Sequence, residues 1–190
     1  MAAVRLKDGQ TIEADLVLVG IGILPSIEPL FLAGADVDNG ILVDGMCRSS
    51  LTDIYAIGDC AAYANDYADG AVIRLESVQN ATDIATNVDM SICSEKKRYC
   101  SVPWFCSNQY DVKLQTVGLS INHDNYVVRG KSEDRSFSVI YLKYGRVTAL
   151  DSVNALRDYA HGRYLVMAGS IIEKSLLANT KIPLIAMLDN

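Results

Sequence analysis

Apolar and polar positions follow different patterns in the two halves of the chain. The run 16–21 is apolar apart from one glycine, which is typical of a strand buried on both faces of a helix-covered sheet. The shorter runs 40–44 and 54–57 predict two further strands. Apolar residues recur every three or four positions over 74–92, which predicts an amphipathic helix. Residues 4–13 predict a β-hairpin around an Asp-Gly turn.

The pattern changes after Pro103, where short segments of strand type follow one another. A helical pattern follows them over 155–168 and ends at Gly169. The first half therefore predicts pieces of an open α/β sheet, and the second half predicts an antiparallel sheet with helices at its end. The predicted strands of the second half are 112–117, 126–128, 137–142 and 146–150, with a turn at Lys143-Tyr144-Gly145 between the last two.

Charge is distributed unevenly along the 190 residues. Residues 1–95 carry 15 acidic and 4 basic side chains and residues 96–190 carry 8 and 13, for a net charge of -6. The break indicates two structural units. The basic side chains are scattered and form no recognition motif, so nucleic-acid binding is not expected. The sequence shows neither a membrane-length apolar run nor a signal peptide, and the five cysteines form no C-x-x-C pair, which together predict a reduced, cytoplasmic protein.

The stretch 54–61 carries the clearest sign of chemistry. A short apolar strand stops at Gly58, and Asp59 and small residues follow. A glycine at the carboxyl end of a strand lets a ligand approach the backbone, and an aspartate can accept hydrogen bonds from sugar-like hydroxyls. The plainer interpretation is that Asp59 caps a following helix. His123 and His161 have no partners at metal-ligand spacing, so no metal site is predicted.

Three segments, taken in order, resemble one family. They are 15–22 with Pro25, 53–61, and 74–81 followed by 103–111, which begins Pro103-Trp104-Phe105. Their order and spacing resemble the FAD-dependent NAD(P)H:ferredoxin reductases that serve bacterial oxygenases and P450s, within the pyridine nucleotide-disulphide oxidoreductase superfamily. The resemblance covers nearly the whole chain and weakens toward its end. Residues 74–81 and 103–111 argue against other flavoproteins of the superfamily, such as a nitrite-reductase subunit or an apoptosis-inducing-factor-like protein.

The resemblance implies an α/β fragment of a two-dinucleotide-binding-domain flavoprotein, followed by an α+β C-terminal domain with an antiparallel sheet. Residues 1–24 resemble the end of the NAD(P)H-binding domain, 25–95 the closing part of the FAD-binding domain, and 100–190 the C-terminal reductase domain. The family passes electrons from NAD(P)H through FAD to a [2Fe–2S] ferredoxin. Neither G-x-G-x-x-G nor G-x-x-x-x-G-K-[ST] occurs here, so both glycine-rich loops are expected to be missing. We therefore expect no catalytic residue and little activity in this chain alone.

The resemblance also implies where FAD would bind. Asp59 corresponds to the aspartate that bonds the ribityl chain, and the Val78 backbone N–H to a donor for the flavin pyrimidine oxygen, where a helix dipole favours negative charge. Trp104 would lie beside the isoalloxazine. The plainer alternatives are core packing for Val78 and Trp104 and a solvated side chain for Glu76. The expected cofactor-binding residues are Gly58, Asp59, Glu76, Ser77, Val78 and Trp104.

Three positions depart from the family pattern. Cys106 stands where a second tryptophan is usual, Asn108 replaces an aspartate, and Thr86 stands where some members have an arginine toward their partner. These departures put electron exit and partner recognition in doubt. Cys60 is expected either near the cofactor or as a small buried apolar residue. The alternative function is a non-catalytic truncated fragment that self-associates as a homodimer through exposed sheet edges.

Overall fold

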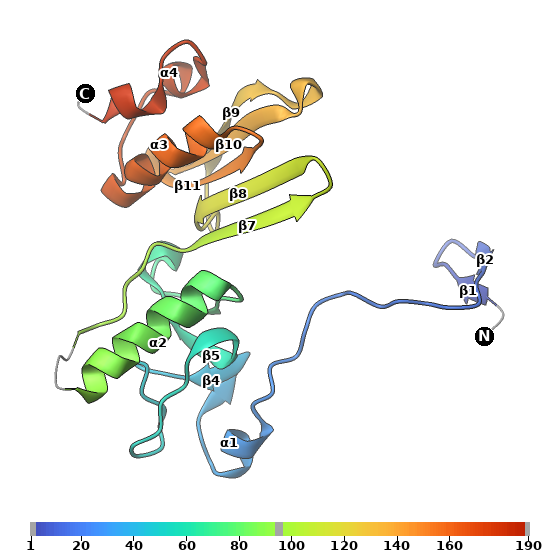
Figure 1. Cartoon of the computed structure of the whole chain (residues 1–190), viewed down its shortest axis with the longest axis vertical. Helices are drawn as coiled ribbons and strands as arrows, with labels where there is room; N and C mark the ends of the chain where they lie inside the picture. The colour runs from blue at the N-terminus through green and yellow to red at the C-terminus, as the bar shows by residue number, and fades with distance from the viewer. Residues whose placement is uncertain (1–2, 94–96, 189–190) are drawn as a thin grey trace.

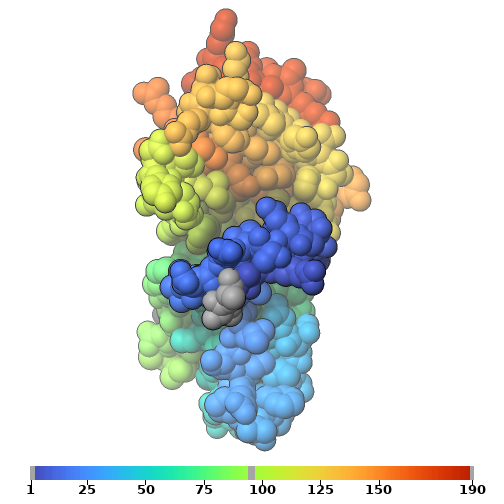
Figure 2. Space-filling view, turned by 90° about the vertical axis from the view of Figure 1, so that its right-hand side faces the viewer, coloured from blue at the N-terminus to red at the C-terminus, as the bar shows by residue number. Residues whose placement is uncertain are grey.

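The computed structural model describes residues 3–93 and 97–188, which form two sheet-centred units and a separate N-terminal hairpin (Figure 1). Strands β1 (Ala3–Arg5) and β2 (Thr11–Glu13) pair antiparallel, which confirms the predicted hairpin. Figure 2, turned by a quarter, shows the same hairpin in dark blue in front of the other two units. No helix of the described residues is long and apolar enough to cross a membrane.

The apolar run 16–21 does not form the predicted strand. It is extended chain, with Leu18 89% and Ile21 91% exposed. A strand buried on both faces needs neighbouring strands and covering helices, and the described residues supply neither around this segment. The prediction is therefore wrong for this structure, and the run leaves an exposed apolar surface.

The first unit is built on a four-stranded sheet in the order β3-β4-β5-β6. Strands β4 and β5 are parallel, and the two outer pairs are antiparallel. A single-turn helix, α1, precedes the sheet and ends just before Gly34. The elements are α1 (Glu28–Leu32), β3 (Val37–Asp38), β4 (Gly40–Leu42), η1 (Gly58–Cys60), β5 (Ala61–Ala64), η2 (Asp66–Ala68) and β6 (Val72–Arg74), where η marks a turn of 3-10 helix.

Segment 54–57 is not the strand that enters this sheet. Only Tyr55 forms a bridge, with Arg48, and the sheet strand begins after the η1 turn. The chain turns sharply just before it, because Asp53 has a positive φ of 60°. A short apolar run cannot by itself distinguish a paired strand from an extended approach to a turn. The predicted strand 54–57 is therefore wrong, and the predicted strand 40–44 is confirmed over 40–42.

Helix α2 (Val78–Ile92) runs along the first unit (Figure 1) and confirms the predicted helix from residue 78 onward. It begins there because Ser77 is its N-cap: Ser77 Oγ accepts a hydrogen bond from the Asn80 N–H at 3.0 Å. Ile84 and Val88 pack into the core beside Ile41 of β4.

Two polar side chains of α2, those of Asn80 and Asn87, are buried. Asn80 is accommodated because its side-chain oxygen accepts hydrogen bonds from the Tyr63 and Tyr99 hydroxyls at 2.8 and 3.2 Å, and its amide donates to the Leu75 carbonyl at 3.0 Å.

The second unit contains an antiparallel five-stranded sheet in the order β7-β8-β11-β10-β9, which confirms the predicted antiparallel sheet; four of its five strands were predicted. The edge strand β7 was not predicted. Helix α3 packs on β8 and β11, where Gly162 lets the helix approach Leu150. The elements are β7 (Trp104–Gln109), β8 (Val112–Gly118), β9 (Asn125–Lys131), η3 (Ser132–Asp134), β10 (Ser136–Lys143), β11 (Arg146–Val153), α3 (Leu156–Ala168), α4 (Lys174–Ala178) and η4 (Leu184–Met187).

The two units meet through a few specific contacts. Tyr67 of η2 packs against the core of the second unit. Lys143 at the end of β10 forms an ion pair with Asp69. The Trp104 N–H donates to Gln79 Oε1 of α2 at 3.4 Å. Through the last contact, the start of α2 is joined to the start of β7.

Candidate flavin-binding site

The η1 turn presents Gly58 and Asp59 differently. Gly58 is buried with φ 71°, and a Cβ at this position would lie 3.5 Å from the Ala81 Cβ of α2. The Asp59 side chain is exposed and, among the residues that the structure describes, has no hydrogen-bond partner. The turn leads into β5, so the alternative in which Asp59 caps a following α-helix is wrong. Asp59 therefore offers a free carboxylate beside α2.

Arg74 connects two of the predicted site residues. Its Nη1 donates to the Asp59 carbonyl at 2.7 Å, and its Nη2 lies 2.6 Å from Glu76 Oε1. The Arg74 side chain is 6% exposed, whereas that of Glu76 is 43% exposed. Glu76 is therefore a partly exposed member of an ion pair and not a solvated single charge. We did not predict Arg74 as a site residue. The only signal for it was its place in the segment 74–81.

The first turn of α2 presents free backbone donors. The first N–H groups of any helix have no intrahelical partner, and Ser77 satisfies only that of Asn80. The N–H groups of Val78 and Gln79 are thus available for a ligand. The Val78 side chain is 87% exposed, so the expectation of core packing for it is wrong. This helix end combines accessible donors, a favourable dipole and an exposed apolar side chain.

Trp104 begins the edge strand β7 and is 36% exposed, which excludes the alternative of an ordinary core tryptophan. A small cavity of about 90 Å³ lies beside it. Glu76 and Ser77 line this cavity together with Pro103 and Trp104. Three of the expected residues thus share one cavity, and Gln79 fixes the Trp104 backbone to the helix.

The six expected residues therefore lie around the start of α2. Gly58 packs on the helix, Arg74 links Asp59 to Glu76, and Trp104 and Ser77 line the same cavity. The first unit supplies a turn and a helix end, and the second unit supplies an aromatic side chain. No metal-binding cluster of His, Cys, Asp or Glu occurs in the part of the chain that the structure describes.

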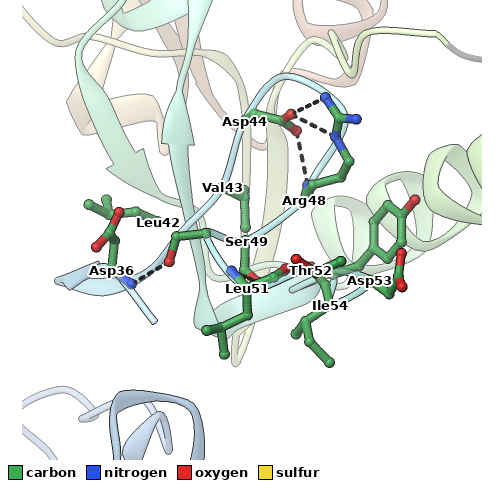
Figure 3. A pocket seen from close by; sticks show the side chains of 12 residues that line it. Asp36, Leu42, Val43, Asp44, Arg48, Ser49, Leu51, Thr52, Asp53 and Ile54 are labelled. Carbon is green, nitrogen blue, oxygen red and sulfur yellow. Dashed lines mark hydrogen bonds and ion pairs between the residues drawn. The ribbon is translucent and has the colours of Figure 1, made fainter. Parts of the chain in front are cut away.

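A larger hollow of about 700 Å³ lies elsewhere on the first unit (Figure 3). Asp44 and Arg48 of its lining form an ion pair with one another, with Arg48 Nη2 2.7 Å from Asp44 Oδ2. Each of these charges is satisfied by the other. None of the expected cofactor-binding residues lines this hollow, so its size does not mark it as the flavin site.

The three departures lie on exposed surfaces. Cys106 and Asn108 are on β7, and Thr86 is on α2, where its hydroxyl donates to the Thr82 carbonyl at 2.9 Å. The five cysteines are free thiols. Cys60 is partly buried and donates to the Ile57 carbonyl at 3.4 Å.

Comparison with known proteins decides the family. Residues 1–85 match the family model for pyridine nucleotide-disulphide oxidoreductases, and residues 104–188 match the model for the reductase C-terminal domain. The chain corresponds to a C-terminal portion of a ferredoxin reductase of this family. It is 53% identical to the ferredoxin reductase subunit of 5,5'-dehydrodivanillate O-demethylase from a Sphingobium species, over 95% of this chain and 44% of that protein. It is 38% identical to putidaredoxin reductase from Pseudomonas putida, over 97% and 43%.

Solved structures agree with this family. The chain superposes on the reductase of the covalent putidaredoxin reductase–putidaredoxin complex with a TM-score of 0.92 and 36% identity, covering 99% of this chain and 45% of that one. The ferredoxin reductase for the CYP199A2 system from Rhodopseudomonas palustris gives 0.90 and 39%, covering 96% and 45%. The chain therefore spans less than half the length of the relatives it matches. Members of this family use FAD and NAD(P)H.

Proposed function

We propose that this chain supplies one wall of the flavin site of an NAD(P)H:ferredoxin reductase. The observation that carries the proposal is the convergence of Asp59, the first turn of α2 and Trp104 around one exposed helix end. A free carboxylate suits the hydroxyls of a ribityl chain, and the N–H of Val78 suits an electron-rich oxygen. The residues present thus fit the flavin half of FAD.

In the proposed role, the chemistry that bound FAD would supply is hydride uptake from NAD(P)H and single-electron delivery to a [2Fe–2S] ferredoxin. The role of the residues of this chain is to bind the flavin and to shield it from water. Asp59 holds the sugar-like chain, Val78 presents its N–H, and Trp104 excludes water from one side of the ring. We assign residues 1–24 to the end of the NAD(P)H-binding domain, 25–95 to the close of the FAD-binding domain and 100–190 to the C-terminal reductase domain.

A titration of the isotope-labelled chain tests the flavin wall. We expect FAD and FMN to move the amide NMR signals of Asp59 and Val78 and the indole signal of the single tryptophan, Trp104. AMP should not move them, because the 190 residues contain neither glycine-rich phosphate motif. Asp59→Ala should weaken the flavin response about tenfold, the loss of a charged hydrogen bond, whereas Asp89→Ala on the exposed side of α2 should not. Equal responses to FMN and AMP would contradict the proposal.

The same chain should not oxidise NADH. Stoichiometric yellow flavin that NADH reduces, with electron delivery to a ferredoxin, would show that these 190 residues are sufficient for activity.

The alternative of a self-associating fragment rests on a different observation. Large apolar side chains of the run 16–24 are exposed, with Leu16 at 77% and Leu24 at 93%. Contiguous exposed apolar surface favours association with another surface. Light scattering over a range of concentrations tests this: a homodimer that Leu18→Lys converts to a monomer would support it, and a clean monomer would contradict it.

A further inference from the structure

Arg74 occupies an unusual place in an acidic unit. It is one of only 4 basic residues among residues 1–95, against 15 acidic ones. It ends strand β6, where it pairs with Ala62 of β5. Because β5 directly follows the η1 turn, this register brings the long Arg74 side chain back to Asp59. A side chain that is 6% exposed and carries a charge has to be held by specific partners.

The two partners of Arg74 belong to the two parts of the proposed flavin wall. The Asp59 carbonyl, 2.7 Å from Nη1, is part of the η1 turn. The Glu76 carboxylate, 2.6 Å from Nη2, lies one residue before the N-cap of α2. The guanidinium is planar and rigid, so the separation of its two terminal nitrogens sets the separation of the turn and the helix start. Nε is buried without a partner among the described residues, so only the two terminal nitrogens hold the group.

Gly40 provides the space for this arrangement. It has φ 143°, and a Cβ added to it would lie 3.0 Å from Arg74 Cδ and 2.8 Å from the Cys60 carbonyl oxygen. A side chain at this position of β4 would therefore press on both the arginine and the turn that it holds. The backbone of β4 at Gly40 thus lies close against the Arg74 side chain.

We propose that Arg74 is a positioning residue of the flavin site, an inference that rests on the proposed function. It fixes the Asp59 turn relative to the first turn of α2, so that the carboxylate and the Val78 N–H reach one ligand together. It also neutralises Glu76, whose negative charge would otherwise lie close to the electron-rich edge of the flavin. Lysine keeps the charge but has no planar fork, so it cannot hold both partners at this spacing.

The test uses the labelled chain with and without FMN. In the absence of FMN, Arg74→Met should shift or broaden the amide signals of the η1 turn and of residues 76–78, and leave those of β8 to β11 unchanged. With FMN, the apparent affinity should fall about tenfold for Arg74→Met and by less for Arg74→Lys. Arg48→Met is the matched control, because Arg48 forms a similar ion pair with Asp44 on the exposed surface of the same unit. It should change neither property.

A second variant guards against loss of folding in the first. Gly40→Ala retains the arginine at position 74 but should shift its side chain, and should therefore produce the same local changes at the η1 turn. If FMN binds the natural chain and Arg74→Met binds it equally well, the proposal is overturned. If the natural chain shows no FMN response at Asp59 and Val78, both the proposed flavin wall and the role of Arg74 in flavin binding are contradicted. The FMN-free spectra then still decide separately whether Arg74 holds the turn.

Discussion

Arg129 is the residue whose removal should most damage the second unit. It is 3% exposed, and its Nε lies 3.0 and 3.1 Å from the two carboxylate oxygens of Asp158 on α3. Its other two nitrogens donate to three backbone carbonyls of the C-terminal segment, at 2.6 to 3.1 Å. Arg129→Met would leave Asp158 partly buried without its cation and would remove the arginine donors from three backbone carbonyls. Removing one partner of a buried pair costs about 3–5 kcal/mol, and we expect about 4 kcal/mol here.

Urea unfolding followed by circular dichroism measures this loss, with Trp104 fluorescence as a second probe inside the same unit. The matched control is Arg135→Met, which removes the same charge from an ion pair with Asp111. The Arg135 and Asp111 side chains are 57% and 69% exposed. A surface pair of this kind contributes about 0–1 kcal/mol. If Arg129→Met unfolds so readily that no baseline exists, Arg129→Lys should still lose more stability than Arg135→Met. Equal losses for the two methionine variants would refute the reasoning.

Three further predictions concern other parts of the molecule. Gln79→Met should shift the fluorescence of Trp104 to longer wavelength and raise its quenching by acrylamide, because the bond to the Trp104 backbone is lost, while Gln109→Met at the far end of β7 should change neither. Gly118→Ala should lower the free energy of unfolding by at least about 2 kcal/mol, since Gly118 has φ 73° and a Cβ would lie 2.2 Å from a backbone oxygen of β11. Burial raises the pKa of Asp151, so the folded state binds this proton more tightly than the unfolded state, and stability should fall as the pH rises from about 4 through the raised pKa. Asp151→Asn should remove that fall and increase the melting temperature at neutral pH, and an unchanged pH profile would contradict the assignment.

The sequence predicted elements best where the period of apolar and polar residues distinguishes the buried face of an element from its exposed face. The alternating strands of the second unit and helix α2 were found because their periods reflect a core that is present within the chain. The run 16–21 was predicted wrongly for the same reason: its composition suits burial between layers, and the described residues contain no such layers around it. Strand β7 was missed because Trp104 and Phe105 are both exposed at the edge of the sheet, so no alternation marks it.

Only part of the site could be predicted from the sequence, and the residues that were missed are polar. Gly58 and Asp59 were recognised from their residue types at the end of an apolar run. Arg74 was not, because nothing in a sequence shows which carbonyl an arginine will reach across a strand pair. Gln79 was likewise missed as a link to Trp104, since that bond joins two units and depends on how they pack.

The start of α2 explains why these polar residues matter for the proposed site. Gln79 and Asn80 are consecutive and both buried, and consecutive residues of a helix point about 100° apart. Gln79 therefore reaches the second unit at Trp104, while Asn80 reaches the Tyr63 hydroxyl within the first unit. The N–H of Val78 lies next to this pair and is positioned by both units at once. A change in the packing of the two units would therefore move the Val78 N–H, the proposed hydrogen-bond donor to a flavin bound there.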